Sequence, residues 1–225
     1  MSIGERLQIA TAGMHCISAW IARPKGMPKG GVVVAQEIFG VNAHVRNLVE
    51  RLAEAGHVAI APAFFDHLEQ GVELDYDEAG IARGRALAGE LGLERAVADV
   101  MAAAEAIASA GRIGVVGFCW GGTVALLAAL RHGLPAVSFY GARNVAWLGE
   151  ATDVPLQFHF GERDASIPPE AVQRHREALP HAEVHTYPAG HGFNCDQRAD
   201  HDPVSATLAW QRTLEFLNRH LAGKV

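Results

Sequence analysis

The sequence contains little of several features that mark particular protein classes. Only three of its 225 residues are cysteine, at positions 16, 119 and 195, so any intramolecular disulfide would leave one thiol over. That number suits a reducing compartment. Lys and Arg form no basic block, and the formal net charge is −6. A nucleic-acid partner is therefore not expected, because phosphate binding needs clustered cations.

Targeting and membrane signals are also missing. The first ten residues, MSIGERLQIA, carry charge within six positions and lack the apolar core of a signal peptide. No apolar run approaches the roughly 20 residues that span a bilayer. We therefore expect a cytoplasmic protein without a membrane partner, either a monomer or a small homo-oligomer.

What the chain does contain is typical of a globular enzyme. Its composition is 49% hydrophobic and 20% charged, which is enough apolar material for a buried core. There is no internal repeat, low-complexity tract or long polar linker. We predict a single domain over residues 1–225.

Short apolar runs, rich in Val, Ile and Phe, alternate with stretches of helical periodicity. The runs lack clean polar–apolar alternation, as expected for strands buried on both faces. Predicted strands are 31–35, 58–61, 113–116, 136–140, 156–160 and 184–187, after a hairpin of 6–11 and 15–22. Predicted helices are 43–55, 93–109, 123–132, 169–179 and 204–222. This order predicts an α/β fold with a mostly parallel central sheet flanked by helices on both faces.

The segment 64–93 is the least regular part of the chain, with acids and glycines mixed through FFDHLEQGVELDYDEAG. It follows the predicted strand 58–61, and loops at the carboxyl ends of strands form the binding crevice of open α/β sheets. The segment either covers that crevice or is a solvated excursion that contains one helix.

The stretch GFCWGG, residues 117–122, is the most informative motif. It matches the thiol version of the nucleophile elbow G-x-S-x-G, in which glycines flank a residue on a strained turn between strand and helix. The helix N-terminus favours the Cys119 thiolate. An inert core cysteine is the alternative, and the spacing of the glycines excludes a G-x-G-x-x-G dinucleotide site.

An acid and a histidine follow the elbow in the order that an α/β-hydrolase requires. The strand 156–160 runs into GERDASIPP, and the strand 184–187 runs into PAGHGF. We take Asp164 as the acid in preference to Glu162, because the loop turns back after Asp164. His191 is expected to accept the Cys119 proton and to pass it to the leaving oxygen, while Asp164 fixes its tautomer.

A metal site is the competing interpretation of the same region. His191, Cys195 and His201, with nearby aspartates, offer ligand atoms, but the spacings H-x3-C and C-x5-H match no common zinc pattern. We therefore expect no metal.

The stretch QEIFGVN, residues 36–42, follows the predicted strand 31–35. In this position the backbone N–H groups of Ile38 and Trp120 would form an oxyanion hole. Glu37 is harder to explain, because a carboxylate among apolar residues is desolvated unless it has a partner. It either forms a salt bridge at the strand end or contacts Cys119 or His191.

Together QEIFGVN, GFCWGG, the GERD loop and AGHGF resemble the dienelactone hydrolases, in order and over about residues 31–217. The resemblance implies an α/β-hydrolase fold, no cofactor, and a triad of Cys119, Asp164 and His191. It also implies that Glu37 pairs with the resting thiol, and that substrate binding moves this glutamate to deprotonate the cysteine.

The chain departs from the family pattern at the substrate carboxylate. Reference members resemble one another in holding it with two arginines, one of them four residues after the catalytic histidine, where this chain has Cys195. Arg83 and Arg85 lie in the segment of the other arginine, and Arg198 is a candidate replacement for the missing one. The missing arginine argues against dienelactone itself as the substrate.

From these observations we expect a cofactor-independent hydrolase that opens a small lactone or cleaves a short ester through an acyl-enzyme on Cys119. Two alternatives stay open: an acyl-thioester hydrolase with the same triad, and a non-catalytic redox-sensing or ligand-binding domain.

Overall fold

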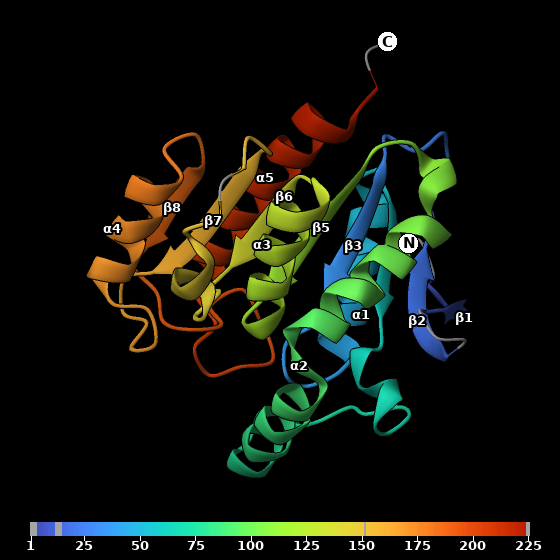
Figure 1. The fold of residues 1–225 in the computed structure, drawn as a ribbon, viewed down its shortest axis with the longest axis horizontal. Helices are drawn as coiled ribbons and strands as arrows, with labels where there is room; N and C mark the ends of the chain where they lie inside the picture. Colours follow the sequence, from blue (N-terminus) through green and yellow to red (C-terminus); the bar gives the residue numbers. More distant parts are fainter. Residues whose placement is uncertain (1–3, 12–14, 151, 224–225) are drawn as a thin grey trace.

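The structure is a computed structural model that describes residues 4–11, 15–150 and 152–223. In this part of the chain eight strands form one sheet in the order β1-β2-β4-β3-β5-β6-β7-β8 (Figure 1). Neighbours from β4 to β8 are parallel, whereas β1 and β2 are antiparallel additions at one edge. The strands are β1 (Glu5–Ala10), β2 (Cys16–Ala22), β3 (Gly31–Ala35), β4 (Val58–Pro62), β5 (Ile113–Phe118), β6 (Ala136–Phe139), β7 (Leu156–Gly161) and β8 (Glu183–Tyr187).

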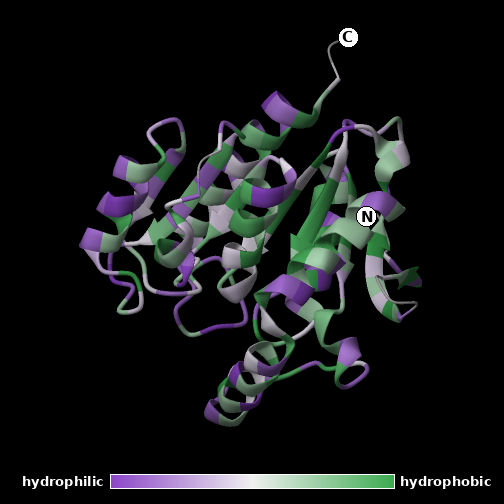
Figure 2. Ribbon diagram, in the orientation of Figure 1, coloured by the Kyte–Doolittle hydropathy of each residue, from purple (hydrophilic) through white to green (hydrophobic). Residues whose placement is uncertain are grey.

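The predicted mostly parallel sheet with helices on both faces is confirmed. All predicted strands form, with ends displaced by at most two residues. Every residue of β3 is buried, and Figure 2 shows the central strands as mostly hydrophobic, with hydrophilic residues on outer helices and loops. Burial on both faces explains why these strands read as continuous apolar runs.

The helices are α1 (Ala43–Glu54), α2 (Glu78–Ala106), α3 (Trp120–His132), α4 (Pro169–Ala178) and α5 (Pro203–Leu221), with short 3₁₀ turns η1 (Phe64–His67), η2 (Ala108–Ala110) and η3 (Asn144–Trp147). Alternate residues of β7 show that α4 and α5 cover opposite faces. The rings of Phe158 and Phe160 contact His175 of α4, whereas His159 meets Thr213 of α5. No helix in the described part of the chain is long and apolar enough to cross a bilayer.

The largest difference from the prediction is the start of α2. The sequence predicted a helix over 93–109, but α2 begins at Glu78, with a break at Gly92 where φ is 77°. Glycines at positions 80, 84, 89 and 92 lower the helix propensity of this segment, so the sequence pattern did not predict the first half of α2. One of them is required by packing, because a Cβ at Gly84 would overlap the backbone oxygen of Ile38. The segment 64–93 is therefore irregular only up to Asp77, and the one helix that the sequence allowed in it is the first half of α2.

Candidate active site

The nucleophile candidate stands at the junction of β5 and α3, near the middle of the sheet (Figure 1). Cys119 has φ 54° and ψ −117°, a backbone conformation that L residues rarely adopt. The flanking glycines permit it, since a Cβ at Gly117 would overlap the backbone oxygen of Gly121. A Cβ at Gly121 would overlap the oxygens of Ala35 and Gln36. Helix α3 starts directly at Trp120, three residues earlier than predicted, so the sulfur lies at the helix N-terminus.

The loops after β7 and β8 bring an acid and a histidine to this cysteine. His191 Nε2 lies 3.2 Å from Cys119 Sγ, and His191 Nδ1 lies 2.7 Å from Asp164 Oδ2. The other carboxylate oxygen of Asp164 accepts the backbone N–H of Ser166 at 2.8 Å. The ring of Tyr140 packs on the imidazole, with ring centres 5.0 Å apart. The three residues therefore form a chain of contacts from acid to thiol.

The electrostatics of His191 favour its protonated form. Burial alone would lower its pKa, but hydrogen bonds and charge interactions with Asp164 and Cys119 outweigh burial and raise the pKa to about 10. An imidazolium beside the sulfur stabilises a thiolate. His191 is thus suited to carry a proton within reach of the Cys119 sulfur.

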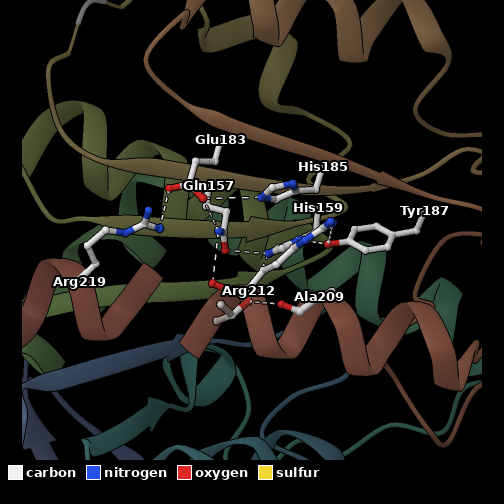
Figure 3. A network of polar contacts seen from close by, with 9 residues as sticks. Gln157, His159, Glu183, His185, Tyr187, Ala209, Arg212 and Arg219 are labelled. Carbon is white, nitrogen blue, oxygen red and sulfur yellow. Dashed lines mark hydrogen bonds and ion pairs between the residues drawn. The ribbon is translucent and has the colours of Figure 1, made fainter. Parts of the chain in front are cut away.

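A buried polar network supports the strand that leads to His191 (Figure 3). The Tyr187 hydroxyl, at the end of β8, lies 2.7 Å from His159 Nδ1 and accepts a hydrogen bond from Arg212 at 3.1 Å. Burial lowers the pKa of His159 well below its usual value, further helped by His185 and Arg212. A neutral His159 therefore ties β7, β8 and α5 together beneath the histidine loop.

Two backbone N–H groups point to an oxyanion hole. Among the described residues, the backbone N–H groups of Ile38 and Trp120 donate no hydrogen bond to a backbone oxygen in a loop or in another helix or strand. Both residues line the cleft that contains Cys119. Trp120 is the first residue of α3, where amides lack intrahelical partners. Both amides therefore remain candidates for the oxyanion hole that the sequence predicted.

Glu37 is 1% exposed and makes its contact with an arginine. Its Oε1 lies 3.5 Å from Arg198 Nη1, and its buried Oε2 has no hydrogen-bond partner. Among the described residues it forms no hydrogen bond to Cys119 or His191, either of which the sequence had suggested as a contact. In this structure the thiol faces His191, and the carboxylate is held by Arg198.

The cleft at the thiol encloses about 350 Å³, within the range of small-molecule sites. Besides Cys119, His191 and the two oxyanion candidates, its lining includes Ile81, Arg85 and Ala88 of α2 and Ala142, Arg143 and Ser166 from the loops after β6 and β7. Of the two interpretations of segment 64–93, the structure supports the cover, because the first half of α2 forms one wall.

The metal set considered from sequence does not form. His191 is hydrogen-bonded within the triad, and in the described part of the chain Cys195 instead approaches His44 and Asp196, with candidate ligand atoms within 4.8 Å of one another. His44 Nδ1 and Asp196 Oδ1 are 3.2 Å apart, a hydrogen-bonding distance.

Comparison with known proteins decides the family. The family model of the dienelactone hydrolase family matches residues 17–221. This chain belongs to the dienelactone hydrolase family. A carboxymethylenebutenolidase of Pseudomonas putida is 33% identical over 225 residues, covering 95% of each chain. A crystal structure from Klebsiella pneumoniae, assigned as a dienelactone hydrolase, has a TM-score of 0.84 at 31% identity and covers 96% of this chain and 99% of its own.

A more distant structure shares the fold. A dienelactone hydrolase-like promiscuous phosphotriesterase from metagenomic libraries has a TM-score of 0.77 at 21% identity, covering 98% of this chain and all of its own. Together with the family match, the comparisons identify the chain as a hydrolase of carboxylic esters or lactones with an α/β-hydrolase fold.

In this family member the candidate carboxylate-binding residues separate into two groups. Arg85 and Arg198 line the cleft. Arg83 lies outside the cleft lining and pairs with Glu69. Cys195 is buried, and burial together with the charge of Glu37 raises the pKa of its thiol to about 11. A neutral thiol cannot supply the charge of the arginine it replaces.

Sequence reasoning missed Arg143 and Ser166. Both follow the carboxyl ends of strands, β6 and β7, where open α/β sheets bind ligands. That topological rule could have found them. Neither lies in a motif, so nothing in the local sequence distinguished them from solvated loop residues.

Proposed function

We propose that this protein opens a small lactone or cleaves a short ester through a thioester on Cys119, without a cofactor. The observation that supports the proposal most directly is the contact chain from Asp164 through His191 to the Cys119 sulfur, at 2.7 and 3.2 Å. A nucleophile, a base and an orienting acid within hydrogen-bond reach are the recognised pattern of acyl-transfer sites.

This geometry supports the following acylation step. The Cys119 thiolate attacks the substrate carbonyl, and the negative oxygen of the tetrahedral intermediate accepts the N–H groups of Ile38 and Trp120. Collapse of the intermediate breaks the C–O bond, and His191 gives its proton to the leaving alkoxide. In a lactone this alcohol stays attached to the acyl group, so ring opening and acylation are one event.

Deacylation reverses the roles. Neutral His191 takes a proton from water, the hydroxide attacks the thioester carbonyl, and the same two N–H groups hold the oxyanion. The carboxylic acid leaves, and the thiolate–imidazolium pair is restored. Asp164 keeps the Nδ1 proton of His191 in place throughout.

We further propose that Glu37 gates the thiol. Its buried carboxylate pairs with Arg198, which lines the cleft. Electrostatic interactions with Glu37 and Cys119 are among those that raise the pKa of Arg198. A substrate anion that engages Arg198 would weaken this pair and free the carboxylate to take the Cys119 proton and pass it to His191, which gives the thiolate–imidazolium pair that attacks the substrate. The gate would thus respond to occupation of the cleft.

The experiment is acyl-enzyme trapping with two matched variants. Cys119→Ala should abolish turnover of a short ester and the thioester mass adduct seen on rapid quenching. Cys16→Ala, which removes an exposed free thiol on β2, should behave like the wild type. Turnover that survives in Cys119→Ala would exclude Cys119 as nucleophile. The wild type should also be assayed on a panel of lactones, esters and thioesters. Turnover of the thioesters alone would exclude the ester and lactone assignment.

A further inference from the structure

The cleft has the opposite charge to the rest of the chain. The formal net charge of the chain is −6, yet three arginines, Arg85, Arg143 and Arg198, line the cleft, and its described lining contains no Asp or Glu. Walls of one charge sign concentrate oppositely charged ligands. The lining therefore points to an anionic substrate.

The arginines lie on two sides of the nucleophile. Strands β3 and β6 are the two neighbours of β5, which carries Cys119 at its end (Figure 1). The guanidinium of Arg198 lies 5.9 Å from the ring centres of Phe39 and Tyr76, on the β3 side. Gly84, next to Arg85 on α2, packs on Ile38 in the same loop. Arg143 follows β6, across Cys119 from both.

Arg143 projects from a fixed point of the backbone. Its neighbour Asn144 is fully buried, accepts a hydrogen bond from Thr123 at 2.9 Å and donates one to Ser138 at 3.2 Å. A Cβ at Gly141 would overlap the Asn144 amide, so the whole turn is tightly packed. The base of the arginine is thus held by side chains of α3 and β6.

The charge of Arg143 is not neutralised within the described part of the protein. No carboxylate lies in salt-bridge range of its guanidinium, and the same holds for Arg85. Arg198, by contrast, faces Glu37 at 3.5 Å and Asp200 at 4.0 Å. The guanidinium of Arg143 is therefore free to bind a ligand anion.

Resting on the hydrolase function proposed above, we propose that Arg143 is a specificity residue for a second anionic group. The substrate class is then an ester or lactone with two carboxylates or similar anions, one on each side of the scissile carbonyl. The group on the β3 side meets Arg85 and Arg198, and the other meets Arg143. One anion alone would leave one side of the cleft unused.

Four aryl esters test this inference: phenyl acetate, phenyl hemisuccinate, 3-acetoxybenzoate and the hemisuccinate of 3-hydroxybenzoate. They carry no anion, one on the acyl side, one on the alcohol side, and one on each. We expect the dianionic ester to have the highest kcat/KM in the wild type. In Arg143→Gln its advantage over phenyl acetate should fall about tenfold, the scale of one charge-assisted hydrogen bond.

The pattern of rates across the four esters distinguishes direct binding of one anionic group by Arg143 from a general attraction of anions to the cleft. One monoanionic ester should share the loss in Arg143→Gln and the other should keep its rate. Arg83→Gln, whose guanidinium lies outside the cleft, should leave all four ratios unchanged. An equal loss on both monoanionic esters, or no loss on any, would overturn the role of Arg143. Because phenyl acetate turnover through Cys119 reports the hydrolase function separately, the two proposals can fail independently.

Discussion

Replacing Asp164 by Asn should disable His191 in two ways that the structure allows to be separated. The Asp164 carboxylate is fully buried, and its two oxygens have different partners. Oδ1 accepts the Ser166 N–H at 2.8 Å, so the amide oxygen of Asn would keep that place. The amide NH₂ would then face His191 Nδ1 and donate to it. The remaining ring proton would sit on Nε2, pointing at Cys119, where a base is needed.

The magnitude follows from the lost charge. A hydrogen bond to a charged group contributes about 1.5–3 kcal/mol, and one pKa unit corresponds to about 1.4 kcal/mol. Removing the Asp164 charge should therefore lower the pKa of His191 by about one to two units from its raised value of about 10. The inverted tautomer should lower kcat by a factor on the order of 10³–10⁴.

The direction of the His191 pKa shift also determines how the stability of the folded state depends on pH. Because the pKa of His191 is raised from 6.5 to about 10 on folding, its charged form stabilises the folded state fully below pH 6.5. That contribution is lost as the pH rises through about 10. In Asp164→Asn the pKa of His191 is lower, so the stabilisation by its charged form should be smaller and should be lost at lower pH.

Two measurements test this prediction. NMR titration of the His191 ring, assigned with a His191→Gln spectrum, gives the pKa directly, and stopped-flow assays give kcat near neutral pH. A pKa that moves by less than half a unit would refute the electrostatic part. A fall in kcat of less than about tenfold would refute the tautomer argument.

Two further substitutions test the surroundings of the thiol. Glu37→Gln removes a buried negative charge from the cluster around Cys119, so iodoacetamide alkylation of the thiol should shift to lower pH; an unchanged pH profile would contradict the gating role. Gly121→Ala should destabilise the fold by about 1–3 kcal/mol and abolish activity, because the new Cβ overlaps backbone oxygens at the end of β3. Its control, Gly89→Ala on α2, meets nothing within 4 Å and should keep or slightly raise the melting temperature. Equal stability of the two glycine variants would show that the elbow has room for a side chain.

Much of the site could be predicted because it depends on local order along the chain. The elbow needs small residues at fixed offsets from Cys119, and a doubly buried strand needs a continuous apolar run. Asp164 and His191 each follow such a strand. Since carboxyl ends of parallel strands meet at one edge of a sheet, their order in the sequence was enough to bring them together.

By itself, then, the sequence determined the sheet, the elbow and the succession of nucleophile, acid and histidine. Tertiary structure alone decided the partner of Glu37, since Arg198 lies 161 positions away in a loop without regular periodicity. It also decided which arginines line the cleft. Arg83 and Arg85 are two residues apart on α2, and only helix rotation sends one to Glu69 and the other to the cleft. Arg143 reaches the cleft because β6, which precedes it, pairs with β5, which ends beside Cys119.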